Sequence, residues 1–162
     1  PHLGQARCID VASPGQMNVR EWKSHLKDIH EAFYDDLVGT ADCGAFDGGC
    51  LTVARALQSV IGGDIVVLVR PDDTADHAAV LKDDKLWDYD GPLKPARFLE
   101  RFNRTEMIGV PWRAHGFRPI REGDLPNAFV DEALIERLAR LFASSLPDEL
   151  QVEVGQLAPA PR

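Results

Sequence analysis

Three residues between positions 42 and 91 have the types needed for nucleophilic catalysis by a thiol. Cys50 follows a glycine-rich loop, His77 precedes the apolar run 78–81, and Asp88 lies in the run 86–89. A thiol becomes a strong nucleophile only when it is ionised, and a histidine held in place by a third group is a common base for that step. The residue types and their order predict a Cys-His-Asp triad.

Cys50 is expected at the beginning of a helix. Apolar residues recur every three or four positions over 50–60, and two glycines at 62–63 end the pattern. A helix N-terminus stabilises a thiolate. Gly48 and Gly49 permit a sharp turn and a close approach of substrate, so we expect them to form the oxyanion or substrate loop. The alternative is that Cys50 is a small buried apolar side chain.

A hairpin is expected to bring His77 close to an aspartate. Side chains alternate along a strand, so strands over 77–82 and 85–90 with a two-residue turn place His77, Asp88 and Asp90 on one face. Either aspartate could orient the imidazole. Asp88 lies inside an apolar pattern, where a charge needs a partner, whereas Asp90 precedes a Gly-Pro turn. We therefore favour Asp88.

The remaining elements follow from periodicity and from turn residues. Asn18 is the expected cap of the first helix, and residues 1–16 and 155–162 are expected to be an irregular lead-in and a disordered tail. Helices are predicted over 18–37, 50–60, 95–103 and 131–144, and strands over 65–69, 77–82, 85–90, within 107–119 and over 150–154.

Composition favours some classes of protein over others. The chain has 162 residues and a net charge of -8, which argues against binding to nucleic acid or to an anionic membrane. No apolar run approaches the roughly 20 residues of a membrane span. Three cysteines do not suggest a disulfide framework, so we expect a cytoplasmic protein, while export without a classical signal or delivery into another cell stays open.

The stretches GGCLTVARAL, DHAAVL and KLWDYDG resemble the papain-like cysteine peptidase superfamily, in its small bacterial and viral branches. The resemblance implies one α+β catalytic domain over 1–154, with helices on a small, mainly antiparallel sheet and the nucleophile at a helix N-terminus. It implies Cys50 as the nucleophile, His77 as the base and Asp88 as the orienting residue. Two features depart from that family: Leu51 replaces the usual aromatic residue, and no glutamine lies between Gln16 and Gln58, where that family often has an oxyanion donor several residues before the cysteine.

Other cysteine and histidine roles remain open. The motif DCGAF at 42–46 is weakly similar to the nucleophile motif of NlpC/P60 cell-wall peptidases, which makes Cys43 a rival nucleophile. His115 is a rival base in a loop. Cys43, Cys50 and His77 together could bind a metal, but the chain has no cysteine pair at zinc-finger spacing.

We therefore expect a cysteine hydrolase that cleaves an amide or isopeptide bond in a peptide or protein substrate and needs no cofactor. A side-chain deamidase or transglutaminase-like enzyme with the same triad, and a non-catalytic binding module on the same fold, are the alternatives. The loops at 39–49, 71–77 and 107–119 are expected to form the walls of the cleft.

Overall fold

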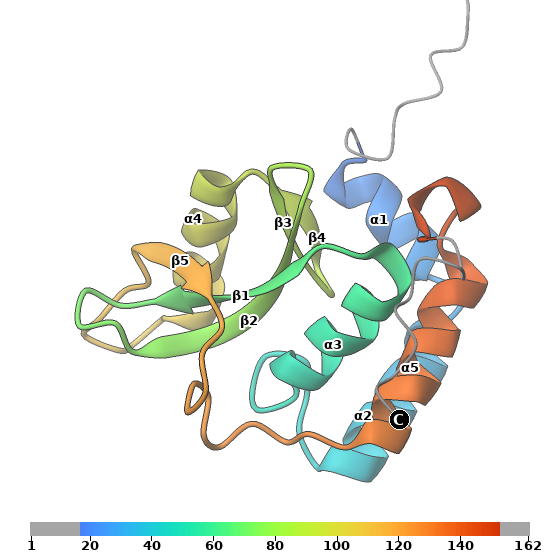
Figure 1. Cartoon of the computed structure of the whole chain (residues 1–162), viewed down its shortest axis with the longest axis horizontal. Coiled ribbons are helices and arrows are strands. Elements are labelled where there is room, and N and C mark those ends of the chain that lie inside the picture. Colours follow the sequence, from blue (N-terminus) through green and yellow to red (C-terminus); the bar gives the residue numbers. More distant parts are fainter. Residues whose placement is uncertain (1–16, 153–162) are drawn as a thin grey trace, which may run out of the picture.

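The computed structural model describes residues 17–152, which form an α+β fold with helices packed on a five-stranded antiparallel sheet (Figure 1). The expected lead-in 1–16, including Cys8, and the expected tail lie outside the described residues. In chain order the elements are α1 (Val19–Leu26), α2 (His30–Ala41), α3 (Cys50–Ile61), β1 (Asp64–Val69), β2 (Ala75–Lys82), β3 (Lys85–Asp88), β4 (Gly91–Leu93), α4 (Pro95–Glu106), β5 (Gly116–Pro119), α5 (Glu132–Ser145) and a 3₁₀ turn at Asp148–Leu150.

The single helix predicted over 18–37 is wrong, because the chain forms α1 and α2 with a turn between them. Asn18 caps α1 as expected, since its side chain accepts a hydrogen bond from the Glu21 N–H. The backbone N–H of Ile29 donates to the Leu26 carbonyl, which tightens the chain into a turn at the end of α1. The apolar stripe runs on through the turn, because Leu26, Ile29 and Phe33 are all buried.

The sheet has the strand order β4-β3-β2-β1-β5. Lys82 pairs with Lys85, so the register expected for the hairpin is confirmed. Asp83 and Asp84 form its turn with φ of 52° and 60°, the left-handed geometry of a tight hairpin. The second strand ends at Asp88 rather than at 90, because β4 turns back at Gly91 to pair with β3.

Each face of the sheet packs against different helices. Ala78, Val80 and Trp87 join the larger core with α1, α2, α3 and α5, which gather on one side of the molecule in Figure 1. Val66 and Leu68 point to the opposite face and pack with α4. Strand β1 is therefore covered on both faces, as its continuous apolar sequence predicted.

The C-terminal region differs from the prediction in one element. Helix α5 begins after Asp131, whose side chain accepts from the Leu134 N–H. The strand predicted over 150–154 is wrong as far as residue 152, because Asp148–Leu150 is a 3₁₀ turn. The Lys82 ammonium group donates to the Leu150 carbonyl. This backbone carbonyl thus has a hydrogen-bond partner on β2 although residue 150 does not pair as a strand.

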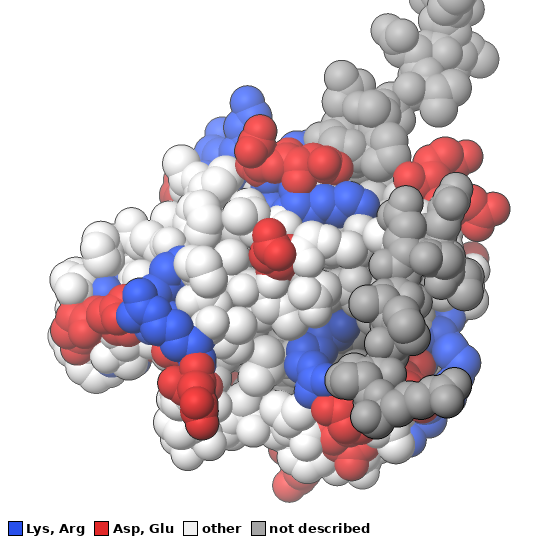
Figure 2. Space-filling model, in the orientation of Figure 1, with Lys and Arg blue, Asp and Glu red and all other residues white. Residues whose placement is uncertain are grey.

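Acidic and basic side chains lie next to each other on the face shown in Figure 2. Several are ion-paired, including Arg55 with Glu132 and Arg118 with Asp124. Within residues 17–152, no helix is long and apolar enough to cross a membrane. The expectation that the chain does not bind nucleic acid stays a prediction.

Two glycines give a matched test of this fold. Gly63 has φ of +86°, and a Cβ there would lie 2.5 Å from the Leu81 carbonyl oxygen, so Gly63→Ala should lower the free energy of unfolding by more than about 2 kcal/mol. Gly39 lies inside α2 with open space around it, so Gly39→Ala should raise that free energy by roughly 0.5–1 kcal/mol. Chemical denaturation measures both, and equal effects would contradict this account of the β1–β2 region.

Candidate active site

Cys50 is the first residue of α3, and its position depends on the two glycines before it. The Gly49 N–H donates to the Gly44 carbonyl at 3.0 Å, which closes the loop into a tight turn. A Cβ on Gly49 would lie 2.6 Å from that carbonyl oxygen and 3.2 Å from a Leu37 methyl group. Gly48 has φ of +138°, a conformation that L side chains rarely adopt. The loop therefore holds Cys50 at the N-terminus of the helix only with glycine at both positions.

His77 and Asp88 form a buried pair on neighbouring strands. His77 Nε2 lies 3.0 Å from Asp88 Oδ2, and the two residues are 1% and 5% exposed. The partner of His77 is therefore Asp88, and the half-buried side chain of Asp90 takes no part in this hydrogen bond. Because a charged carboxylate is costly to bury alone, the pair is stable only when both members are held in register.

The other imidazole nitrogen, Nδ1, is buried and makes no hydrogen bond of ordinary geometry with the described residues. It is the nitrogen left for Cys50, whose thiol is close enough to change the pKa of the ring. Contacts between catalytic groups are often loose before substrate binds. Phe46 stacks on the His77 ring at a centroid distance of 5.4 Å and Phe102 at 5.1 Å. These rings hold the imidazole plane and exclude water from it.

The pKa values of the two groups move in opposite directions. Burial acts to raise the Cys50 pKa, but the hydrogen bond and charge of His77, with the N–H groups of Ala78 and Leu51, outweigh burial and lower it. Burial acts to lower the His77 pKa, but Asp88 and Cys50 raise it to about 9. Both shifts act in the direction of a thiolate beside an imidazolium.

Asp88 has two further partners that the sequence did not reveal. Its Oδ1 accepts from the Asp90 backbone N–H at 2.8 Å and from Arg101 Nη2 at 3.1 Å. Arg101 lies on α4 above the Phe98 ring. A signal was present, because 98, 101 and 102 share one face of the predicted amphipathic helix, and an arginine there needs an acidic partner.

Cys43 lies in the same loop as Cys50 but in a different electrostatic setting. Burial, followed by the charge of Asp47, raises the pKa of the Cys43 thiol. Its side chain is half-buried and lies against Gly48, and it follows the C-terminal cap of α2, whereas Cys50 begins a helix. His115, the rival base, is exposed, and its backbone N–H donates to the Val69 carbonyl at the end of β1. Among the described residues, no group of three or more His, Cys, Asp or Glu side chains is arranged to hold a metal.

A cleft of about 310 Å³ opens at Cys50. Two of the three loops predicted to line it do so, but the third wall is formed by residues 125–128 and not by 107–119. The Phe129 N–H donates to the Gly48 carbonyl, which ties this wall to the cysteine loop. The lining residues are Phe46, Asp47, Gly48, Cys50, Ala75, Asp76 and residues 125–128.

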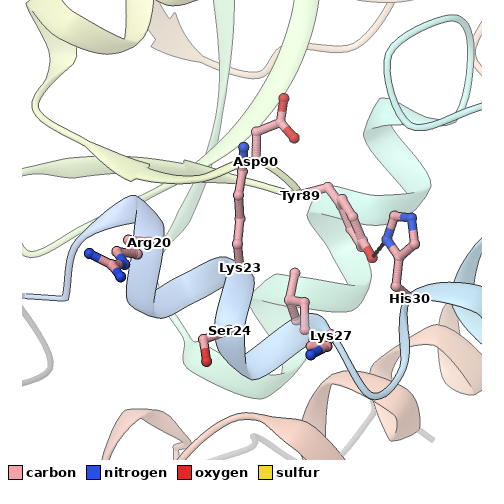
Figure 3. Close-up of a pocket in the computed structure, with 8 residues that line it drawn as sticks. Arg20, Lys23, Ser24, Lys27, His30, Tyr89 and Asp90 are labelled. Carbon is pink, nitrogen blue, oxygen red and sulfur yellow. Dashed lines mark hydrogen bonds between the residues drawn. The ribbon is translucent and has the colours of Figure 1, made fainter.

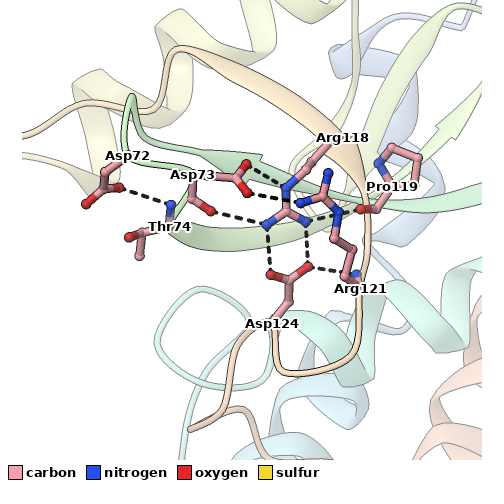
Figure 4. A network of polar contacts seen from close by, with 7 residues as sticks. All are labelled: Asp72, Asp73, Thr74, Arg118, Pro119, Arg121 and Asp124. Carbon is pink, nitrogen blue, oxygen red and sulfur yellow. Dashed lines mark hydrogen bonds and ion pairs between the residues drawn. The ribbon is translucent and has the colours of Figure 1, made fainter.

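A charged network fixes the chain that leads into this wall (Figure 4). Arg118 of β5 forms ion pairs with Asp73 in the β1–β2 turn and with Asp124 in the following loop. Asp124 also accepts from the Arg121 N–H at 2.7 Å. The loop is thus attached at residue 124 to the sheet that carries His77, and at 129 to the loop that carries Cys50.

A larger cavity of about 590 Å³ lies beside α1 and contains neither Cys50 nor His77 (Figure 3). Arg20, Lys23, His30 and Tyr89 are among the residues that line it, and His30 Nδ1 is 2.9 Å from the Tyr89 hydroxyl. Asp90 faces this cavity. This cavity is therefore next to the residues that follow β3, whereas Cys50 lines the smaller cleft.

Comparison with protein-family models, with curated proteins and with solved structures gives no match.

The opposite pKa shifts of the two loop cysteines predict selective labelling. Because the Cys50 pKa is lowered and the Cys43 pKa is raised, Cys50 should react with iodoacetamide at pH 7 at least about tenfold faster than Cys43. The Cys50 rate should fall as the pH drops through its lowered pKa. Peptide mapping by mass spectrometry measures both sites, with Cys50→Ser as the control. Faster labelling of Cys43 would move the candidate nucleophile to the earlier motif.

Proposed function

We propose that this protein is a cysteine hydrolase with a papain-like arrangement, acting on an amide or isopeptide bond. The observation that carries the proposal is the line of buried groups from Asp88 through His77 to Cys50 at the N-terminus of α3. A buried histidine with its pKa raised to about 9, next to a thiol with a lowered pKa, has the electrostatics of an activated nucleophile.

The reaction follows from these protonation states. The Cys50 thiolate attacks the substrate carbonyl carbon, and the C–N bond breaks as the His77 imidazolium gives its proton to the leaving amine. The neutral His77 then takes a proton from water, whose oxygen attacks the thioester carbon; the C–S bond breaks, the carboxylic acid leaves, and the Cys50 thiolate and His77 imidazolium are restored. Asp88 keeps Nε2 protonated and directs Nδ1 toward the sulfur in both steps.

The negative oxygen of the tetrahedral intermediate needs hydrogen-bond donors. The backbone N–H of Cys50 is one candidate, because the first N–H groups of a helix have no partner within the helix. Asn127 is our candidate for the second, since it carries the only side-chain amide among the residues lining the cleft. Gly48 lines the cleft as proposed for a substrate loop, whereas the Gly49 N–H is already bonded.

The small volume of the cleft supports a second candidate reaction, on the side-chain amide of a protein. A volume of about 310 Å³ is at the small end for ligand sites and accommodates a side chain more easily than an extended backbone. Deamidation of a protein side-chain amide, or transfer of its acyl group to an amine, uses the same triad and the same acyl-enzyme, with ammonia as the first leaving group. Ammonia release without backbone cleavage, tested on peptide and protein mixtures, would select this second reaction.

The cytoplasm stays our proposed setting, because a reactive free thiol persists in a reducing compartment. A peptide or protein stays our proposed substrate. Labelling with an electrophilic amide-mimicking probe, followed by peptide mapping, tests the function directly. Modification of Cys50 supports it. A Cys50 that stays unmodified while the fold is intact would favour a non-catalytic binding module.

Substitutions in the triad should give a graded loss of turnover. Cys50→Ala and His77→Ala should be inactive, and Asp88→Ala should lose on the order of 10²–10⁴-fold. Asp88→Asn keeps the shape but removes the charge that raises the His77 pKa, so it should lose about tenfold. Asp90→Asn is the matched control and should stay near wild type, because the bonds of Asp90 to Asp88 and Arg101 are made by its backbone.

The measurements are turnover and the pH dependence of Cys50 alkylation, with thermal unfolding of each variant run alongside. If Asp90→Asn were damaging and Asp88→Ala silent, the third member of the triad would be Asp90.

Asn127→Ala tests the second oxyanion donor. Turnover should fall by roughly 10²–10³-fold, because the donor acts on the transition state, while the rate of Cys50 alkylation stays unchanged. Pro126→Ala, in the same wall of the cleft, is the control and should change turnover little. An Asn127→Ala enzyme with normal turnover would assign the oxyanion site to backbone donors alone.

A further inference from the structure

The Asp88 carboxylate lies between two positively charged groups. Oδ2 faces His77 at 3.0 Å, and Oδ1 faces Arg101 at 3.1 Å. The Arg101 side chain is 16% exposed, and its Nη1 also donates to the Asp90 carbonyl at 3.3 Å. Its guanidinium carbon lies 4.8 Å from the centre of the Phe98 ring. The guanidinium therefore has a fixed position in a poorly solvated environment.

Arg101 supplies the positive charge that makes the buried group of ionised side chains neutral. A Cys50 thiolate and a His77 imidazolium together are neutral, and the ionised Asp88 adds one negative charge to the buried group. Arg101 cancels that charge. A net charge in a low-dielectric interior is costly, and the group can lower the cost by taking up a proton, which here means protonation of the thiolate.

The surroundings add negative charge rather than positive charge. Asp47 of the cysteine loop, Asp90 after β3 and Glu106 of α4 are close enough to influence each other or the triad. Tyr34 of α2 and Cys43 also lie nearby, but the pKa of each is raised, so both stay neutral near neutral pH. Negative charge on Asp47, Asp90 and Glu106 therefore adds to the negative charge around Asp88 and His77.

Positive charge near the triad is scarce. Lys23 of α1 points toward Asp90 in Figure 3 and acts on that residue. Among residues 17–152, Arg101 is the lysine or arginine that forms an ion pair with a member of the triad.

We propose that Arg101 is a positioning residue whose charge balances Asp88 and thereby allows Cys50 and His77 to hold a thiolate and an imidazolium inside the fold. The inference rests on the proposed function, because it assigns Arg101 a part in the resting state of the same site. Arg101 touches neither the sulfur nor the cleft; it acts through Asp88.

Charge balance makes a specific prediction about two groups at once. Removal of a nearby positive charge favours the protonated form of both the thiol and the imidazole. Arg101→Gln should therefore raise the pKa of Cys50 and the pKa of His77, by about one unit each, and slow Cys50 alkylation at pH 6 about tenfold. Arg101→Lys keeps the charge and should stay close to wild type in both values.

The experiment measures iodoacetamide alkylation of Cys50 from pH 4 to 10 and the NMR titration of the His77 ring, with thermal unfolding of every variant. Arg104→Gln, an exposed change on the same helix, is the matched control. If Arg101→Gln only lowers thermal stability and leaves both titrations unchanged, Arg101 is structural and the proposal is wrong. It is also wrong if the His77 pKa falls while the thiol pKa rises, since that pattern indicates loss of Asp88 orientation.

Two further outcomes keep the test decisive. If Arg101→Gln does not fold, the Cys50 titration of Arg101→Lys tests the proposal. A shifted titration in that variant would show that the positive charge is not the property that matters, and the proposal would be wrong. Failure of the proposed function has a different signature: wild-type Cys50 would show an ordinary thiol titration. A wild-type protein with a reactive thiolate but no hydrolase activity would leave the Arg101 test fully informative.

Discussion

The hydrogen bond between His77 and Asp88 is the interaction on which the rest of the site depends. Both groups are almost fully buried, so water solvates neither, and the His77 imidazolium is stabilised by the Asp88 carboxylate. Their separation depends on the hairpin register, because a one-residue slip would move Asp88 to the opposite face of the sheet. The tight turn at Asp83 and Asp84 therefore sets the register that brings Asp88 to His77, where Asp88 helps to raise the His77 pKa.

The site also depends on holding a helix against a sheet. Cys50 lies on α3 in the larger core, while the His77 ring contacts Phe98 and Phe102 of the smaller core around α4. The site thus forms where the two cores meet. The loop after β5 links the two sides, through the Arg118 ion pairs at one end and the Phe129 bond to Gly48 at the other. Such anchoring limits movement of the thiol relative to the imidazole.

Local patterns were reliable where one physical rule dominated. Continuous β-formers in β1, the capping residue Asn18 and the two-residue turn of the hairpin were all predicted from the sequence and are confirmed. The predicted secondary structure was wrong where the same spacing of apolar residues fits more than one kind of buried element. The stripe over 18–37 stays buried although the helix breaks at 27–29, and the apolar residues near 150 are buried in a 3₁₀ turn rather than a strand.

The sequence by itself determined which chemistry was available: a cysteine after two glycines at a helix start, and a histidine and an aspartate on facing strands. These features are local, since they depend on turn geometry and on the alternation of side chains. Only the tertiary structure decided that Arg101 reaches Asp88, that Phe46 stacks on His77, and that residues 125–128 wall the cleft. Those contacts join segments distant in sequence, and they follow from how two cores pack, which no single stretch of sequence specifies.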